Sequence, residues 1–344
     1  MKHLKTLALL MALPTAAVSQ ALPETTINVI GNLGITTQSQ TLEAPFWTQE
    51  IGPASGGAIT ANFRTMNEMG LKGGDMFGMV KDGVMHITTG QLGHHTGADP
   101  FLDATDLAGL SPTMEEFRKV SEAFKPTLAT YMRDNMGLHL ISLQSYQNQV
   151  LYCRDEITGL SDLKGRRVRT SGASQIEFIE HFGGTGVNVS FGEVQQALEQ
   201  GVVDCAITGS LGGYSAKWYE AANYIYTLPI NFGAGATVAN AAWWDGLDPA
   251  VQEFLTTEIT ALSDKMWALN FEENSMGYAC NSTGPCPLGE PAGMTRVEPS
   301  EQDIEMRRQA LIETVLPGWV ARCGDICKTA FNENLSDLTG LTIE

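Results

Sequence analysis

The chain has 344 residues, of which 43% are hydrophobic and 17% are charged, a composition typical of a globular protein with room for two domains of ordinary size. The formal net charge is −18 at pH 7. Such a charge excludes nucleic acid from the expected partners, because phosphate binding needs a basic face, and it also argues against docking on anionic lipid.

The first 21 residues have the features of a secretory signal peptide. Lys2 and Lys5 precede an apolar run from Leu7 to Val18, and Ser19-Gln20-Ala21 is a small-x-small cleavage site. The run is too short to span a bilayer, and no Cys follows it for lipid attachment. We therefore expect export to the periplasm without direct membrane anchoring.

Strands and helices alternate from the start of the mature chain, with polar loops after two of the strands. The predicted strands are 25–30, 58–63 and 84–88, and the predicted helices are 42–51 and 75–81. Asn32 follows the first strand and Gln91 follows the third. Loops in these places present ligand groups in α/β sheets, so both residues are candidate ligand contacts. A turn-forming role is the alternative for Asn32.

A histidine pair follows Gln91. His94 and His95 are adjacent, and neighbouring side chains point apart in an extended chain. They cannot easily hold one ion, and no acidic cluster accompanies them. We expect them to be structural or to lie at the rim of a cleft, and we predict no metal site.

The middle of the chain is predicted to be helical and then extended. Thr113 and Glu116 form a capping-box pattern for a helix that reaches Phe124. A second helix is expected from Pro126 until Gly137 stops it. Residues 138–154 then form one long extended segment.

The segment 161–209 has a βαβαβ pattern, which predicts a parallel sheet covered by helices. Its predicted strands are 166–169, 187–189 and 202–207, and its helices are 175–182, with Ser174 as cap, and 193–200. Arg169 ends the first of these strands beside a Ser-Gly turn, where such sheets bind ligands. Its guanidinium is a fixed fork of donors that suits a carboxylate, and a surface salt bridge is the alternative.

The remaining elements are mostly helical. Helices are predicted at 214–222, at 251–278 and at 301–327, the last interrupted at Pro317-Gly318, with an irregular tail after Phe331. Residues 230–240 are extended. Within them, Phe232 is a candidate ligand contact, because Gly233 and Gly235 let the backbone approach a neighbour closely.

Six cysteines favour an oxidising compartment, and their even number allows complete pairing. Their connectivity stays open at this point. Cys280 and Cys286 bracket a turn-rich loop that could close easily, whereas Cys323 and Cys327 lie one helical turn apart, a marginal distance for a bridge. Zinc is the less favoured reading, because no two-residue Cys spacing or partner His is nearby.

Several of these motifs resemble the solute-binding proteins of tripartite ATP-independent periplasmic (TRAP) transporters, of the DctP type. The resemblance lies in D-L-K-G-x-x-x-R, which ends at Arg169, and in F-G-E-V-x-x-A-L-x-x-G-V-V-D, which spans 191–204. It extends to residues 81–84 and 240–247. It implies an α/β, two-domain periplasmic binding protein (type II-like), with crossing hinge strands at 138–154 and 230–240 and a long helix spanning both domains.

The resemblance also implies domain bounds. Domain one would comprise 22–145 plus 236–275, and domain two 146–235 plus 276–344, after a signal peptide at 1–21. Cys153 and Cys205 would lie on strands of the same domain.

The resemblance assigns roles to four residues of the site. Arg169 would clamp the ligand carboxylate, and Gln149 stands where similar proteins often have a ligand-contacting Arg or Gln. Phe191 would pack on the ligand, with core packing as the alternative. Thr208 replaces the usual Asn, and the Glu-Trp of the metal-using keto-acid branch is absent near Ile207. We therefore expect neither metal nor cofactor.

The sequence thus predicts a periplasmic solute-binding protein that captures a small organic acid and delivers it to the membrane subunits of a TRAP permease. The neutral Gln149 and Thr208 favour a monocarboxylate with hydroxyl or amide groups over a dicarboxylate. A ligand-sensing subunit for a signalling receptor is the alternative. An exported enzyme is less favoured, because no G-x-S-x-G, H-E-x-x-H or phosphate-loop motif is present and no catalytic residue is predicted.

Overall fold

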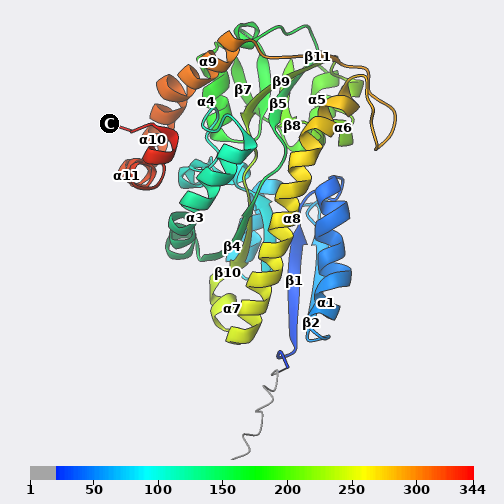
Figure 1. Ribbon diagram of the computed structural model, residues 1–344, viewed down its shortest axis with the longest axis vertical. Coiled ribbons are helices and arrows are strands. Elements are labelled where there is room, and N and C mark those ends of the chain that lie inside the picture. The colour runs from blue at the N-terminus through cyan, green and yellow to red at the C-terminus, as the bar shows by residue number, and fades with distance from the viewer. Residues whose placement is uncertain (1–20) are drawn as a thin grey trace, which may run out of the picture.

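The computed structural model describes residues 21–344, so the predicted signal peptide lies outside the described residues except for Ala21. The described chain forms two separate β-sheets flanked by helices (Figure 1). The first sheet has the order β2-β1-β3-β10-β4, and the second has the order β11-β9-β5-β8-β6-β7.

The strands of the first sheet are β1 (Thr25–Gly31), β2 (Ile59–Thr65), β3 (Ile87–Gln91), β4 (Leu138–Gln144) and β10 (Gly235–Asn240). Those of the second are β5 (Gln149–Cys153), β6 (Arg167–Thr170), β7 (Thr185–Asn188), β8 (Cys205–Gly209), β9 (Tyr224–Asn231) and β11 (Thr295–Val297). The helices are α1 (Ile51–Ala54), α2 (Met76–Lys81), α3 (Met114–Met136), α4 (Ala173–His181), α5 (Val194–Glu199), α6 (Gly212–Ser215), α7 (Ala241–Asp245), α8 (Pro249–Asn281), α9 (Glu301–Ala310), α10 (Leu316–Cys323), α11 (Asp325–Asn334) and α12 (Ser336–Thr339).

The first sheet depends on the buried apolar side chains of β1. Ile27 and Val29 are fully buried. They pack with Trp47, which follows β1 in the chain, and with Leu255 of α8. Strands β1, β2 and β3 are parallel, whereas β10 pairs antiparallel with both β3 and β4. The strand that returns late in the chain therefore lies inside the sheet formed by the early ones.

The second sheet contains the predicted βαβαβ unit. Strands β6, β7 and β8 are parallel, and α4 and α5 connect them. The third strand starts at Cys205 rather than Val202, because Gly201 has a φ of 69° and turns the chain before the strand begins. As a result β8 continues to Gly209, and Thr208 lies near its carboxyl end.

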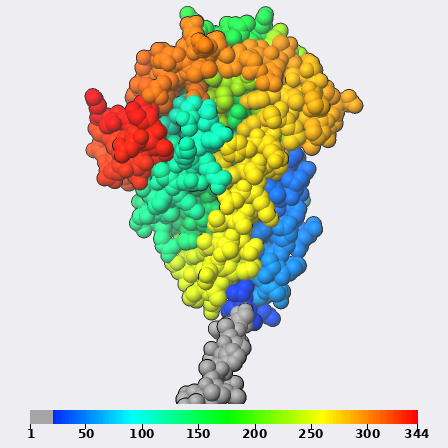
Figure 2. Space-filling view, in the orientation of Figure 1, coloured from blue at the N-terminus to red at the C-terminus, as the bar shows by residue number. Residues whose placement is uncertain are grey.

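The chain crosses between the sheets at 145–148 and again at 232–234. The 33-residue helix α8 accompanies these crossings, since it packs on β4 of the first sheet and on β9 of the second. Figure 2 shows α8 in yellow at the surface, between α3 and the N-terminal elements. Within residues 21–344 no helix is long and apolar enough to cross a bilayer.

Buried polar side chains of α8 hold the first crossing. Asn270 donates to the carbonyl oxygen of Ser145 at 2.8 Å, and Gln147 donates to Asn270 at 3.0 Å. Glu273 is fully buried and accepts hydrogen bonds from Gln147 and from Thr37, which follows β1. One helix thus hydrogen-bonds the loop after β1 and the segment that leads into the second sheet.

Several local predictions for the helices were also wrong. The helices predicted on either side of Pro126 form the single helix α3, because Phe124, Leu128 and Met132 are buried on one face and stabilise it across the proline. Ser174 does not cap α4, since Gly172 is the cap residue and the Ser174 hydroxyl binds Asp103 instead.

Another wrong prediction concerns the C-terminal helices. Residues 301–323 are helical through Pro317, and the break comes at Gly324, whose φ of 78° favours glycine. Beyond it, α11 and α12 replace the expected irregular tail.

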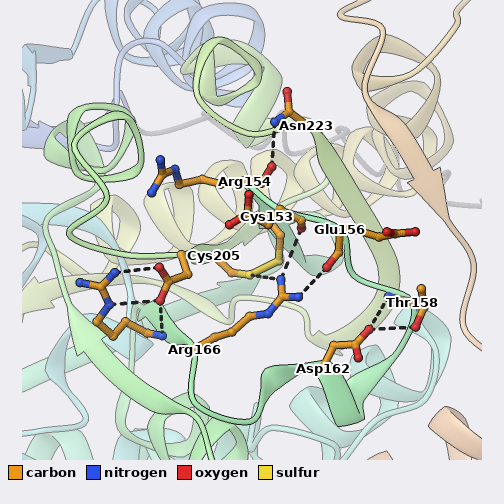
Figure 3. The surroundings of a disulfide bond; sticks show 11 residues. Cys153, Arg154, Glu156, Thr158, Asp162, Arg166, Cys205 and Asn223 are labelled. Carbon is orange, nitrogen blue, oxygen red and sulfur yellow. Dashed lines mark hydrogen bonds and ion pairs between the residues drawn. A yellow bond between two sulfur atoms is a disulfide. The ribbon is translucent and has the colours of Figure 1, made fainter.

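All six cysteines are paired. The disulfide bonds join Cys153 to Cys205, Cys280 to Cys286 and Cys323 to Cys327. The first connects β5 to β8, with Cα atoms 4.1 Å apart, and Arg166 lies against it with Nη1 3.7 Å from the Cys205 sulfur (Figure 3). The helical Cys323–Cys327 pair, judged marginal from its spacing, is bridged with Cα atoms 5.7 Å apart.

The disulfide bonds should contribute unequally to stability. Cys153–Cys205 closes a loop of 52 residues and Cys280–Cys286 a loop of 6, so the unfolded chain gains more freedom when the first is removed. We expect the double variant Cys153→Ala/Cys205→Ala to lose ~4 kcal/mol in the free energy of unfolding, against ~2 kcal/mol for Cys280→Ala/Cys286→Ala. Urea unfolding of the two variants measures the difference, and equal losses would contradict the loop-length argument.

Candidate functional site

A polar pocket lies where the two sheets approach each other, and we call it the inner pocket. Its lining comes from the loops after β1 and β3, from the first crossing, and from the ends of β5, β6 and β8. The lining residues are Asn32, Leu33, Thr36, Gln91, His94, Tyr146, Gln147, Gln149, Arg169, Ser171, Phe191, Thr208, Gly209 and Gly212. Six of the seven predicted ligand contacts are therefore brought together, and Phe232 is not among them.

Arg169 is the most constrained residue of the inner pocket. Its side chain is only 3% exposed. Its Nε donates to the carbonyl oxygen of Val189 at 2.9 Å and its Nη1 donates to that of Ile207 at 2.7 Å. The guanidinium carbon also lies 5.8 Å from the ring centroid of Trp218, in a cation–π contact.

No carboxylate in residues 21–344 forms an ion pair with Arg169. Burial lowers the pKa of its guanidinium to about 10, so the group stays charged at neutral pH. Carbonyl dipoles orient the cation without neutralising it. A buried positive charge without a counterion is an anion-binding feature.

The sheet fixes the position of Arg169. In the register of the second sheet, Arg169 lies between Val187 of β7 and Ala206 of β8. One strand further along, Val150 of β5 pairs with Thr208 and Gln149 pairs with Gly209. The arginine, the threonine and the glutamine therefore converge at one edge of the sheet, as expected for strand ends of an α/β unit.

Two of the three glutamines of the pocket, Gln91 and Gln149, face the second crossing. Gln91 ends β3, and Gln149 donates to the carbonyl oxygen of Gln147 at 2.9 Å. A Cβ atom on Gly233 would lie 3.0 Å from Nε2 of Gln149 and 3.1 Å from Nε2 of Gln91. Gly233 also has a φ of 68°. The glycine predicted to allow a close approach therefore makes room for these two amides.

Asn32 forms a turn and also lines the pocket. Its Oδ1 accepts a hydrogen bond from the N–H of Leu33 at 2.8 Å, which is the turn-forming role. Its own N–H donates to Oε2 of Glu43 at 2.9 Å. Phe191 lines the pocket as well, half-buried, with its ring centroid 5.4 Å from that of Trp218.

Phe232 lies in the core rather than in the pocket. Its ring stacks on Phe117 with centroids 5.3 Å apart, and its side chain is 1% exposed. The cause is Asp106, whose carboxylate accepts hydrogen bonds from the N–H groups of Phe232 and Ala234 at 2.8 and 2.9 Å. These bonds fix the backbone of the second crossing and direct the Phe232 ring to the core.

The Asp106 network continues to the pocket. Asn231 donates to Asp106 at 2.9 Å and accepts from Gln175 at 2.9 Å. Gln175 in turn accepts hydrogen bonds from the N–H and the hydroxyl of Ser171, which lines the pocket. Four side chains thus connect the second crossing to the loop that follows Arg169.

Tyr146, Gln147 and Ser171 also line the inner pocket, and sequence reasoning missed them as site residues. Tyr146 and Gln147 belong to the first crossing, which was predicted to be part of one strand. The signal was the run of six polar residues at 144–149, between two apolar segments. The Tyr146 hydroxyl is buried and has no hydrogen-bond partner among the described residues.

His94 lies at the rim of the pocket, one of the two roles expected for it. Burial, with Arg169 and His95 nearby, lowers its pKa to about 3, so its ring is neutral at neutral pH. His95 stacks on Phe77 with ring centroids 3.9 Å apart. The two histidines therefore face different surroundings.

A two-sheet α/β protein with a buried guanidinium that pairs with no carboxylate of the described chain has the arrangement expected of a solute-binding protein. The chain is a member of the DctP family, the bacterial extracellular solute-binding proteins of family 7, whose profile matches residues 33–315. The predicted family and fold class are thereby confirmed.

Two curated relatives are named for the ligands that they bind. The chain is 26% identical over 166 residues to the ectoine/5-hydroxyectoine-binding periplasmic protein UehA of Ruegeria pomeroyi, an alignment of 48% of each protein. It is 28% identical over 169 residues to the 2,3-diketo-L-gulonate-binding periplasmic protein YiaO of Escherichia coli, covering 45% of this chain and 51% of that protein. The chain thus spans about half the length of the curated relatives it matches.

Solved structures match nearly the whole fold. An extracytoplasmic solute receptor of Bordetella pertussis that binds pyroglutamic acid has a TM-score of 0.79 at 19% identity, covering 92% of this chain and 100% of that one. A TRAP periplasmic solute-binding protein of Desulfovibrio salexigens with bound orotic acid has a TM-score of 0.81 at 15% identity, covering 91% and 98%. At these identities the likeness shows the fold.

Glu43, directly behind Asn32, gives a test of the buried electrostatics. Burial raises its pKa from 4.5 to about 7, so between these values the folded chain keeps a proton that the unfolded chain releases. The glutamate therefore costs stability as the pH rises through this range. We expect Glu43→Gln to gain up to ~3 kcal/mol relative to the parent between pH 4.5 and pH 8.

Urea unfolding of both proteins across that pH range measures the gain. A stability difference that stays constant with pH would mean that Glu43 is ionised throughout, contrary to its burial.

Proposed function

We propose that the protein captures a small organic monocarboxylate in the periplasm and delivers it to the membrane subunits of a TRAP permease. The observation that carries the proposal is the buried guanidinium of Arg169, which has no acidic partner in the described chain. A ligand carboxylate supplies the missing charge and accepts its remaining donors.

The other groups of the inner pocket support a single-charge ligand. Gln91, Gln149, Thr208 and Asn32 offer amides and a hydroxyl, and no second cation lines the inner pocket among the described residues. A second carboxylate placed within the inner pocket would stay unpaired there. Hydroxyl or amide groups beside the carboxylate match these neutral partners, and nothing in this arrangement requires turnover of the ligand.

The two sheets support the predicted domains as the closing units, with 22–145 plus 236–275 on one side and 146–235 plus 276–344 on the other. Closure would strengthen binding because pocket groups come from both sides. The signal-peptide pattern and the complete disulfide pairing support the periplasm. The same site would serve a ligand-sensing subunit, but family membership and the TRAP neighbours favour transport.

The role of Arg169 is tested by a variant of matched shape. A thermal-shift screen of organic acids, with pyroglutamate and orotate among them, first selects a ligand. We expect Arg169→Gln to weaken its affinity, measured by titration calorimetry, by ~2 kcal/mol or more, which is about 30-fold, because the substitution removes a buried charge pair.

Arg167→Gln is the control. Arg167 lies on the same strand but pairs with Asp204 at the surface, so its replacement should leave affinity unchanged. The proposal fails if Arg169→Gln binds within a few fold of the parent.

A further inference from the structure

A larger hollow adjoins the inner pocket, and we call it the outer chamber. Its volume is about 580 Å³, against about 40 Å³ for the inner pocket. The two spaces share five lining residues, which are Leu33, His94, Arg169, Ser171 and Phe191. A ligand held by Arg169 therefore has access to both.

The inner pocket is too small for a whole organic acid. A bound water needs ~10–15 Å³ on this measure, so about three water-sized groups fit. That room suffices for a carboxylate and one substituent on the adjacent carbon. The rest of any larger ligand has to extend into the outer chamber.

The outer chamber has apolar walls on two opposite sides. Leu33, Met66 and Leu71 come from the segments after β1 and β2. Ile176, Val189 and Phe191 come from α4 and from the segment after β7. All but Met66 are only partly buried, so both groups of apolar side chains line a space that the protein itself does not fill.

Packed cores support these apolar walls. Met66 packs with Ile30 and Met76, while Val189 and Phe191 pack against the core cluster that contains Trp218. Apart from Arg169, which the chamber shares with the inner pocket, its charged residues Lys72, Asp75 and Glu193 are exposed. The chamber is also lined by uncharged polar side chains such as Asn67, Thr96 and Asn188, so its contacts for an apolar group come from the two apolar walls.

We propose that the ligand is a monocarboxylate with an apolar body, aliphatic or aromatic, that binds in the outer chamber while its carboxylate and an adjacent hydroxyl or amide occupy the inner pocket. This inference rests on the function proposed above and names the ligand class. Filling the chamber removes both apolar walls from water, and the gain grows with the area covered.

A series of acids with one head group tests the inference. The probes are lactate, 2-hydroxybutyrate, 2-hydroxyvalerate, 2-hydroxyhexanoate and 3-phenyllactate, with gluconate as the acid of polar body. We expect the dissociation constant to fall about three- to fourfold for each added methylene, and gluconate to bind more weakly than 2-hydroxyhexanoate. Gluconate binding as tightly as 2-hydroxyhexanoate, or affinity that is flat along the series, overturns the inference and leaves the proposed function intact.

Two variants distinguish the contribution of the outer chamber to affinity from that of Arg169. Ile176→Ser should weaken 2-hydroxyhexanoate several-fold more than lactate, so the dependence on chain length becomes shallower. Arg169→Gln should weaken all probes alike and keep that dependence. Ile304→Ser, on the exposed face of α9 and outside the chamber, is the control and should change neither. An equal effect of Ile176→Ser on all probes overturns the inference, and failure of every carboxylate to bind the parent protein overturns the proposed function itself.

Discussion

The structure depends on one constraint, which is that the guanidinium of Arg169 is buried and charged without a carboxylate from residues 21–344 to balance it. Two backbone carbonyls and the face of Trp218 hold it in place. None of these groups carries a formal charge, so the site is oriented but not neutralised. Hydrogen bonds to an ionised group are worth roughly 1.5–3 kcal/mol, and an anion that enters gains them with little reorganisation of the protein.

The elements around Arg169 hold its guanidinium in this position. The carbonyl oxygens that bind Arg169 come from the end of β8 and from the segment after β7, so the parallel sheet sets the geometry of the cation. The Asp106 network fixes the second crossing and, through Gln175, the loop that follows the arginine. The rest of the chain is strongly acidic, so recognition of an anion has to rely on these short-range contacts rather than on long-range attraction.

Much of this arrangement could be predicted from the sequence, and the failures have physical causes. Strand periodicity and the motif around Arg169 placed that residue at a strand end. Phe232 could not be placed, because its direction depends on hydrogen bonds that the backbone donates to a carboxylate 126 residues away. Tyr146 was missed because no glycine or proline marks the break between β4 and β5. The continuity of α3 through Pro126 depends on core packing, which local propensity does not contain.

The outer chamber could not be predicted from the sequence either. Its walls are separated by about a hundred residues in sequence, and no periodic pattern links Leu71 to Ile176. Only the tertiary arrangement reveals that these half-buried side chains oppose each other. A binding surface of this kind is a property of the assembled fold, whereas a charged clamp is already visible in a single strand.

Helix α8 has a mechanical consequence for any opening of the gap between the sheets. The helix is continuous over 33 residues. Its buried side chains Asn270 and Glu273 hydrogen-bond the segment where the chain passes from one sheet to the other and the loop after β1. Free rotation of one half about that segment would break those buried hydrogen bonds. If the two halves separate as proposed, we expect the helix to bend, which would limit the width of the opening and favour closure.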